Sequence, residues 1–102
     1  MTNVYVISIK RIKDYSNNIL SKKDQYYEYL GVDYRSGYDC FMRSDIHCKT
    51  FLCTEDANNY FDEVKKNLHK IINFDCYDFS TLGIRKRIIA YKTECRLEIL
   101  KG

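Results

Sequence analysis

The chain has 102 residues, 45% hydrophobic and 30% charged, with a formal net charge of +3 from 17 basic and 14 acidic side chains. This balance is typical of a globular protein and excludes an intrinsically disordered one, and most of the charge cancels, so composition argues only weakly for nucleic acid. No apolar run approaches the roughly 18 residues of a membrane helix and no secretory signal is visible, so we expect a cytoplasmic protein without a membrane partner, forming one domain over residues 1–102.

The first part of the chain predicts a strand and then a short helix. Residues 4–9, VYVISI, are mostly β-branched or aromatic and indicate a buried strand. Ser21 followed by Asp24 is a variant of the capping box, and Gly31 suits the end of a helix. These signals predict a helix over 22–30.

The middle of the chain predicts a hairpin followed by a long helix. After a loop at 33–37, two strands are expected over 38–43 and 46–53, joined by a tight turn at Ser44 and Asp45. Thr54 is a good N-cap for a helix over 55–72, whose apolar residues recur at steps of three and four.

The last part of the chain contains a segment in which apolar and polar residues alternate. Residues 73–83 are either a loop or a fifth strand, and residues 89–99 show the period of two that predicts a strand with one buried face. The resulting order is β-α-β-β-α-β, the arrangement of ferredoxin-like domains. We therefore predict an α+β fold with an antiparallel sheet of four to five strands and two helices.

Residues 39–53, DCFMRSDIHCKTFLC, hold three cysteines and a histidine. The spacings C-x7-C and C-x4-C lack the close pairs typical of zinc sites. Because strand side chains alternate, Cys48 and Cys53 point to opposite faces, and pairing of Cys40 with Lys49 across the hairpin separates Cys40 from Cys48. We predict no metal, no cofactor and no disulfide, with the cysteines acting as small buried hydrophobes.

The first predicted strand has an aromatic residue, Tyr5, at its second position. This strand resembles the first RNA-contacting motif of RNA-recognition-motif domains, whose second position stacks on a base. Phe51 aligns with the phenylalanine of the partner motif, whose glycine and other aromatics are missing here. The resemblance implies a sheet that binds single-stranded RNA or DNA through Tyr5 and Phe51. Basic clusters that include Arg85 and Arg87 would contact phosphates, while a plain core strand is the competing interpretation of Tyr5.

Tyrosines crowd into residues 26–38, interleaved with charged residues. A short helix cannot bury three of these rings on one side, because adjacent positions diverge by about 100°, so some rings must face solvent or a partner. Tyr and Arg together are enriched at the hot spots of protein interfaces. The predicted partner-binding residues are Tyr26, Tyr29, Tyr34, Arg35, Tyr38, Arg43 and Asp45.

No catalytic motif is present, such as G-x-S-x-G or H-E-x-x-H, and we predict no catalytic residues. The leading hypothesis is a non-enzymatic protein that docks on a protein or ribonucleoprotein complex. The absence of Pro and the ten tyrosines indicate an AT-rich genome, which favours a phage or mobile-element inhibitor of a host defence complex, of the anti-CRISPR type. The alternative is a single-stranded nucleic-acid-binding domain. A third hypothesis is an enzyme or metal protein that uses Cys40, Cys48 and His47.

Overall fold

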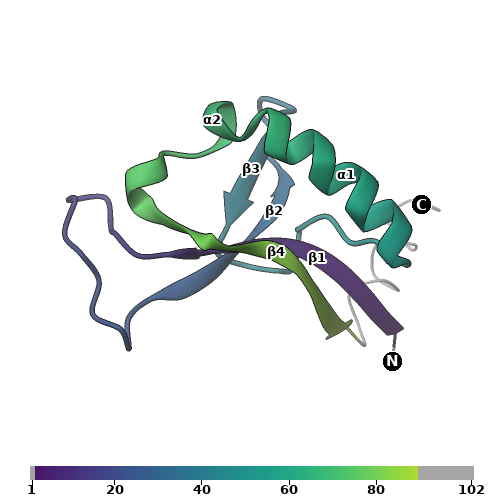
Figure 1. Ribbon diagram of the computed structural model, residues 1–102, viewed down its shortest axis with the longest axis horizontal. Helices are drawn as coiled ribbons and strands as arrows, with labels where there is room; N and C mark the ends of the chain where they lie inside the picture. The colour runs from purple at the N-terminus through teal and green to yellow at the C-terminus, as the bar shows by residue number, and fades with distance from the viewer. Residues whose placement is uncertain (1, 90–102) are drawn as a thin grey trace.

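The computed structural model describes residues 2–89. A four-stranded antiparallel sheet in the order β3-β2-β1-β4 carries both helices on one side (Figure 1), and the predicted α+β class is confirmed. In chain order, the elements are β1 (Thr2–Arg11), β2 (Tyr26–Val32), β3 (Asp39–Met42), α1 (Thr54–Lys66), α2 (Leu68–Ile71), a 3-10 helix (Phe74–Cys76) and β4 (Tyr77–Ile89).

The order of strands and α-helices is β-β-β-α-α-β, so the predicted helix over 22–30 and the ferredoxin-like order are wrong. Ser21 accepts backbone hydrogen bonds from Asp24 (2.9 Å) and Gln25 (3.1 Å), but only one turn forms. The residues that follow, YYEYLGV, form β2. Aromatic residues favour a pleated, half-buried surface, and this preference outweighs the capping signal.

The predicted strand over 46–53 does not form, and β3 pairs with β2 instead. Part of this segment fits between β1 and β2, which pair with each other only from Ser8 to Arg11 of β1. Phe51 exchanges two backbone hydrogen bonds with Tyr5, of 2.8 and 2.9 Å, and the Lys49 N–H donates to the Leu30 carbonyl at 2.7 Å. The segment thus replaces β2 as the neighbour of β1 where the two strands separate.

The predicted helix over 55–72 is present as two helices, α1 and α2, which meet at Asn67. Thr54 is the first helical residue rather than the N-cap. Cys53 occupies the N-cap position and makes no side-chain capping bond. The apolar stripe faces the sheet as predicted, and its most buried members are Ala57, Val64, Leu68 and Ile72.

Within the segment 73–83, Phe74–Cys76 form the 3-10 helix and residues 77–83 are the first part of β4. The predicted strand over 89–99 lies outside the described residues except at Ile89, where β4 ends.

The core lies between the helices and one face of the sheet. Ile7 and Ile9 of β1 and Leu30 of β2 are fully buried there against Val64 and Leu68. At about 25 cal/mol per Å² of apolar surface, fully burying each such side chain contributes roughly 1.5–3 kcal/mol.

A buried polar cluster lies at the end of this face, where β1, β2 and β4 meet. The Arg11 guanidinium donates to the Tyr77 hydroxyl at 3.1 Å and lies 3.6 Å from the Glu28 carboxylate. The Tyr77 hydroxyl donates to the same carboxylate. All three residues are less than a tenth exposed, so each charge depends on the others for compensation.

We expect the stability of the fold to decrease at high pH because of Tyr77. Burial, and then the hydrogen bond and charge of Glu28, raise the pKa of Tyr77 above its usual value. A phenol in the unfolded chain loses its proton near pH 10, whereas the folded phenol keeps it. Unfolding therefore becomes easier as pH rises through that value, by up to about 1.4 kcal/mol per pH unit.

Urea unfolding between about pH 8 and 11 measures this effect, and Tyr77→Phe is the control because it lacks the titrating hydroxyl. The wild type should lose stability more steeply with pH than the variant. Equal slopes would show that Tyr77 titrates in the same way in both states.

Candidate partner-binding site

Residues 33–38, called here the hairpin loop, connect β2 to β3 and have a backbone fixed by its own hydrogen bonds. The Asp33 N–H donates to the Tyr38 carbonyl at 2.9 Å, and the Gly37 N–H donates to the Asp33 carbonyl at 2.7 Å. The Asp33 side chain accepts from the Arg35 N–H at 2.8 Å. Gly37 has a φ of 75°, a left-handed conformation that glycine adopts without steric cost.

This loop displays two large aromatic side chains. Tyr34 is 85% exposed and Tyr38 is 76% exposed. The Arg35 guanidinium lies 5.7 Å from the centre of the Tyr34 ring, and its Nε donates to the Tyr34 hydroxyl at 3.3 Å. Three of the predicted partner-binding residues are thus together on a fixed loop.

Each tyrosine of the hairpin loop also borders a groove. Tyr34 lines a groove of about 500 Å³ together with Val32, Asp33, Cys40, Met42 and His47. Tyr38 lines a second groove of about 560 Å³, against Asp39 of β3 and against Asn67, Lys70 and Ile71. The loop therefore combines projecting rings with concave surface, the combination that receives side chains of a partner.

Cys40 lines the first of these grooves as a partly buried thiol. Burial, and then the charges of Asp33 and Asp39, raise the pKa of the Cys40 thiol. A thiol, unlike a thiolate, is a poor nucleophile and a poor metal ligand. The Cys40 thiol in this groove is therefore held more firmly in its protonated form than a free thiol.

The sheet face opposite the helices carries tyrosines on β2 and arginines on β4, the two strands that flank β1. Arg85 lies 4.3 Å from the centre of the Tyr27 ring, and Arg87 lies 5.0 Å from that of Tyr29. The Lys10 ammonium is 5.8 Å from the Tyr27 ring. These five side chains, called here the open face, lie on the same side as Val4 and Val6 of β1, the cross-strand partners of the two arginines.

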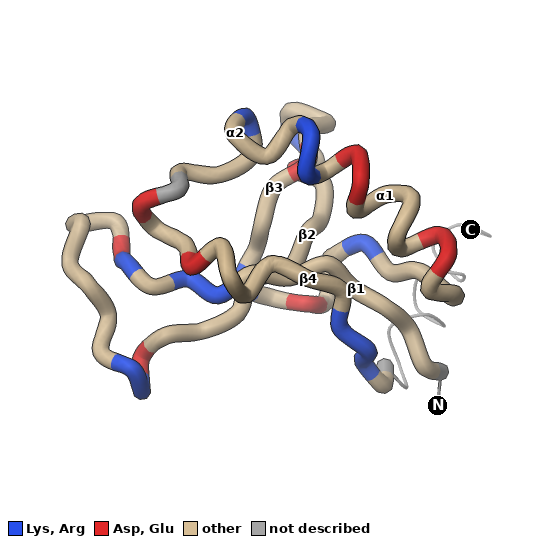
Figure 2. Tube along the Cα trace, viewed as in Figure 1, with Lys and Arg blue, Asp and Glu red and all other residues tan. Residues whose placement is uncertain are grey.

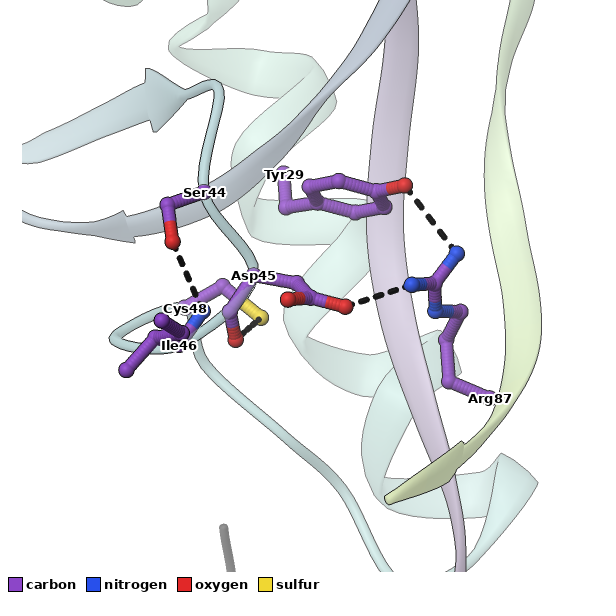
Figure 3. Close-up of polar contacts among 6 residues, drawn as sticks. All are labelled: Tyr29, Ser44, Asp45, Ile46, Cys48 and Arg87. Carbon is purple, nitrogen blue, oxygen red and sulfur yellow. Dashed lines mark hydrogen bonds and ion pairs between the residues drawn. The ribbon is translucent and has the colours of Figure 1, made fainter.

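Asp45 and Tyr29 make an internal contact with Arg87 (Figure 3). Arg87 donates to the Tyr29 hydroxyl at 3.1 Å and to the Asp45 carboxylate at 2.5 Å. The Cys48 thiol donates to the Asp45 carbonyl at 3.3 Å, and the Ile46 N–H donates to Ser44 Oγ at 3.2 Å. The segment around Asp45 is thereby attached to the open face through Arg87.

The remaining predicted residues are at separate places. Arg43 stacks on Tyr26 at 4.2 Å, at the start of β2. Tyr5 alternates with the buried Ile7 and Ile9 and so faces the helices, and the Phe51 ring packs 5.5 Å from Tyr60 of α1.

Tyr5 and Phe51 therefore do not share a face with Arg85 and Arg87.

The stacking of arginine side chains on tyrosine rings was not predicted. It involves every arginine of residues 2–89, namely Arg11, Arg35, Arg43, Arg85 and Arg87. The period of two in YYEYL and in RKR is the sequence signal that could have located the two pairs on the open face.

Comparisons of the chain with protein-family models, with curated proteins and with solved structures found no match. In the part of the chain that the structure describes, no three potential metal-binding side chains gather at one point. Over the same residues, neither helix has the length and apolar character needed to cross a bilayer.

Proposed function

We propose that this chain is a non-enzymatic binding protein that docks on another protein, or on a ribonucleoprotein complex, through its hairpin loop. The observation that carries the proposal is the exposure of Tyr34 and Tyr38, at 85% and 76%, on a loop whose backbone is already hydrogen-bonded. Rings this exposed contribute nothing substantial to the core, whereas at an interface they supply large contact areas.

The physical advantage of such a loop is a low entropic cost of binding. A tyrosine side chain has only two χ angles to fix, and an aromatic ring buries about 150–250 Å². A backbone held by hydrogen bonds does not need to be ordered when the partner arrives, so more of the contact energy remains as affinity. Arg35 adds a guanidinium, which is also enriched at hot spots.

The nucleic-acid alternative is supported by the positive charges of the open face, but the arginines there are already occupied. Arg85 donates to Ser8, Tyr27 and Thr81, and Arg87 donates to Tyr29 and Asp45. A phosphate would have to replace these bonds, and a base would have to displace an arginine to stack on that side of Tyr27 or Tyr29. The rings of Tyr34 and Tyr38 are far more exposed, and the arginine that contacts Tyr34 is Arg35 of the same loop, which would dock together with them.

The role of an inhibitor, which the residue usage suggests, is one form of this function, because an inhibitor acts by covering a surface of its target. The proposal is tested by comparing what co-purifies with the wild type and with a variant in which Tyr34, Arg35 and Tyr38 are alanine. Loss of one specific partner from a folded variant is the expected result.

A further inference from the structure

The two edge strands of the sheet differ in length and in whether a helix packs against them. The strand order puts β3 at one edge and β4 at the other. β3 has four residues and packs against α2. In contrast, residues 83–89 of β4 pair in continuous register with β1, and no other strand of the described chain lies beside them.

An edge of this kind can accept another strand. Within residues 2–89 no strand pairs with its outward N–H and C=O groups, and such groups form a template for main-chain hydrogen bonds. The usable stretch begins at Gly83, because the pairing of β1 with β4 is irregular between Ser8 and Lys10.

The same stretch carries a run of three cations, at residues 85–87 (Figure 2). Arg85 donates only to neutral acceptors, on Ser8, Tyr27 and Thr81, so its charge is not compensated. Lys86 is exposed and has no ion-pair partner among the described residues. Arg87 alone is paired, with Asp45. The edge therefore has an excess of positive charge.

This charge identifies the kind of strand that fits. In full antiparallel pairing of residues 83–89 with a second copy, Lys86 would lie opposite Lys86 and Arg85 opposite Arg87, and like charges directly opposite each other are destabilising. An acidic strand would instead place a carboxylate opposite Lys86, the exposed cation of this run that makes no ion pair within the described residues. We infer that residues 83–89 form a β-augmentation site for an extended acidic segment of a partner protein.

This surface is separate from the hairpin loop, which joins β2 to β3 at the other side of the sheet. The inference is therefore independent of the proposed function, and a substitution in the loop should not affect it.

The test is an NMR titration of the ¹⁵N-labelled full chain with a capped peptide of alternating Glu and Thr residues. The expected result is a shift of the backbone amides of residues 83–89, together with slower hydrogen exchange of these amides. A matched peptide of alternating Lys and Thr should not bind. Shifts confined to the hairpin loop or to α1, or equal binding of the two peptides, would overturn the inference.

A charge exchange makes the test specific to the edge. Lys86→Glu should weaken binding of the acidic peptide about tenfold and permit binding of the basic one. Lys22→Glu, which makes the same charge change at an exposed position before β2, should do neither. Tyr34→Ala with Tyr38→Ala should leave peptide binding unchanged.

Two further outcomes would assign the edge to another partner and contradict the inference. One is binding of an oligodeoxythymidine, but not of the acidic peptide, to residues 83–89. The other is concentration-dependent self-association that protects the amides of these residues without peptide.

Discussion

Replacing Glu28 with alanine is expected to lower the free energy of unfolding by about 3–5 kcal/mol, the cost of leaving a buried charge without its partner. Arg11 is 7% exposed, and Glu28 is the carboxylate that lies 3.6 Å from its guanidinium. The substitution also removes the acceptor of the Tyr77 hydroxyl. Because a domain of this kind is stable by only about 5–15 kcal/mol, the loss is a large fraction of the total.

Urea unfolding followed by circular dichroism measures the change. The matched control is Glu63→Ala, which removes a carboxylate from an exposed ion pair with Lys66 on α1. An exposed pair contributes at most about 1 kcal/mol. If both substitutions had the same small effect, the cluster of Arg11, Glu28 and Tyr77 would not be a buried, mutually dependent unit.

The second large effect concerns binding. Substituting Tyr34, Arg35 and Tyr38 with alanine should weaken partner binding by about 4 kcal/mol, or roughly a thousandfold in Kd, if two of the three side chains act as hot spots of about 2 kcal/mol each. Stability should change by less than about 0.5 kcal/mol, because the substituted side chains are exposed and lie outside the core. Binding is measured by calorimetry with the co-purified partner, and stability by thermal unfolding.

A matched control uses three exposed residues from the long connection between β1 and β2, at a different part of the molecule (Figure 1). Tyr15 and Ile19 are 93% and 76% exposed, and Lys22 is also exposed. Their triple alanine variant should bind as the wild type does. Unaltered binding by the folded loop variant, or equal loss in both variants, would rule out the hairpin loop as the specific contact.

The elements whose residue types or apolar spacing clearly favour one kind of secondary structure could be predicted from the sequence. The strand at residues 4–9 lies within β1, and the apolar stripe of residues 55–72 is the buried face of α1 and α2. The segment 22–30 was misassigned because Ser21, Asp24 and Gly31 are local signals, whereas β2 depends on pairing with two other strands. The position of Cys48 and Phe51 between β1 and β2 has no local signal at all.

The candidate site could also be predicted only where it depends on local sequence, and not where it depends on the pairing of distant strands. The crowding of tyrosines requires that some face outward, and Tyr34 and Tyr38 do so under either assignment of the segment before them. The pairs formed by Tyr27 with Arg85 and by Tyr29 with Arg87 join residues about 58 positions apart in the chain. Such pairs depend on strand register, which a single sequence does not specify.

Site-specific photo-cross-linking tests the docking proposal most directly. A photoreactive phenylalanine analogue is placed at position 34, and in a matched protein at position 15, and each is irradiated with the partner bound. The proposal predicts a covalent adduct with the partner from position 34 and none from position 15. An adduct from position 15 alone, while the partner remains bound to both proteins, would contradict it.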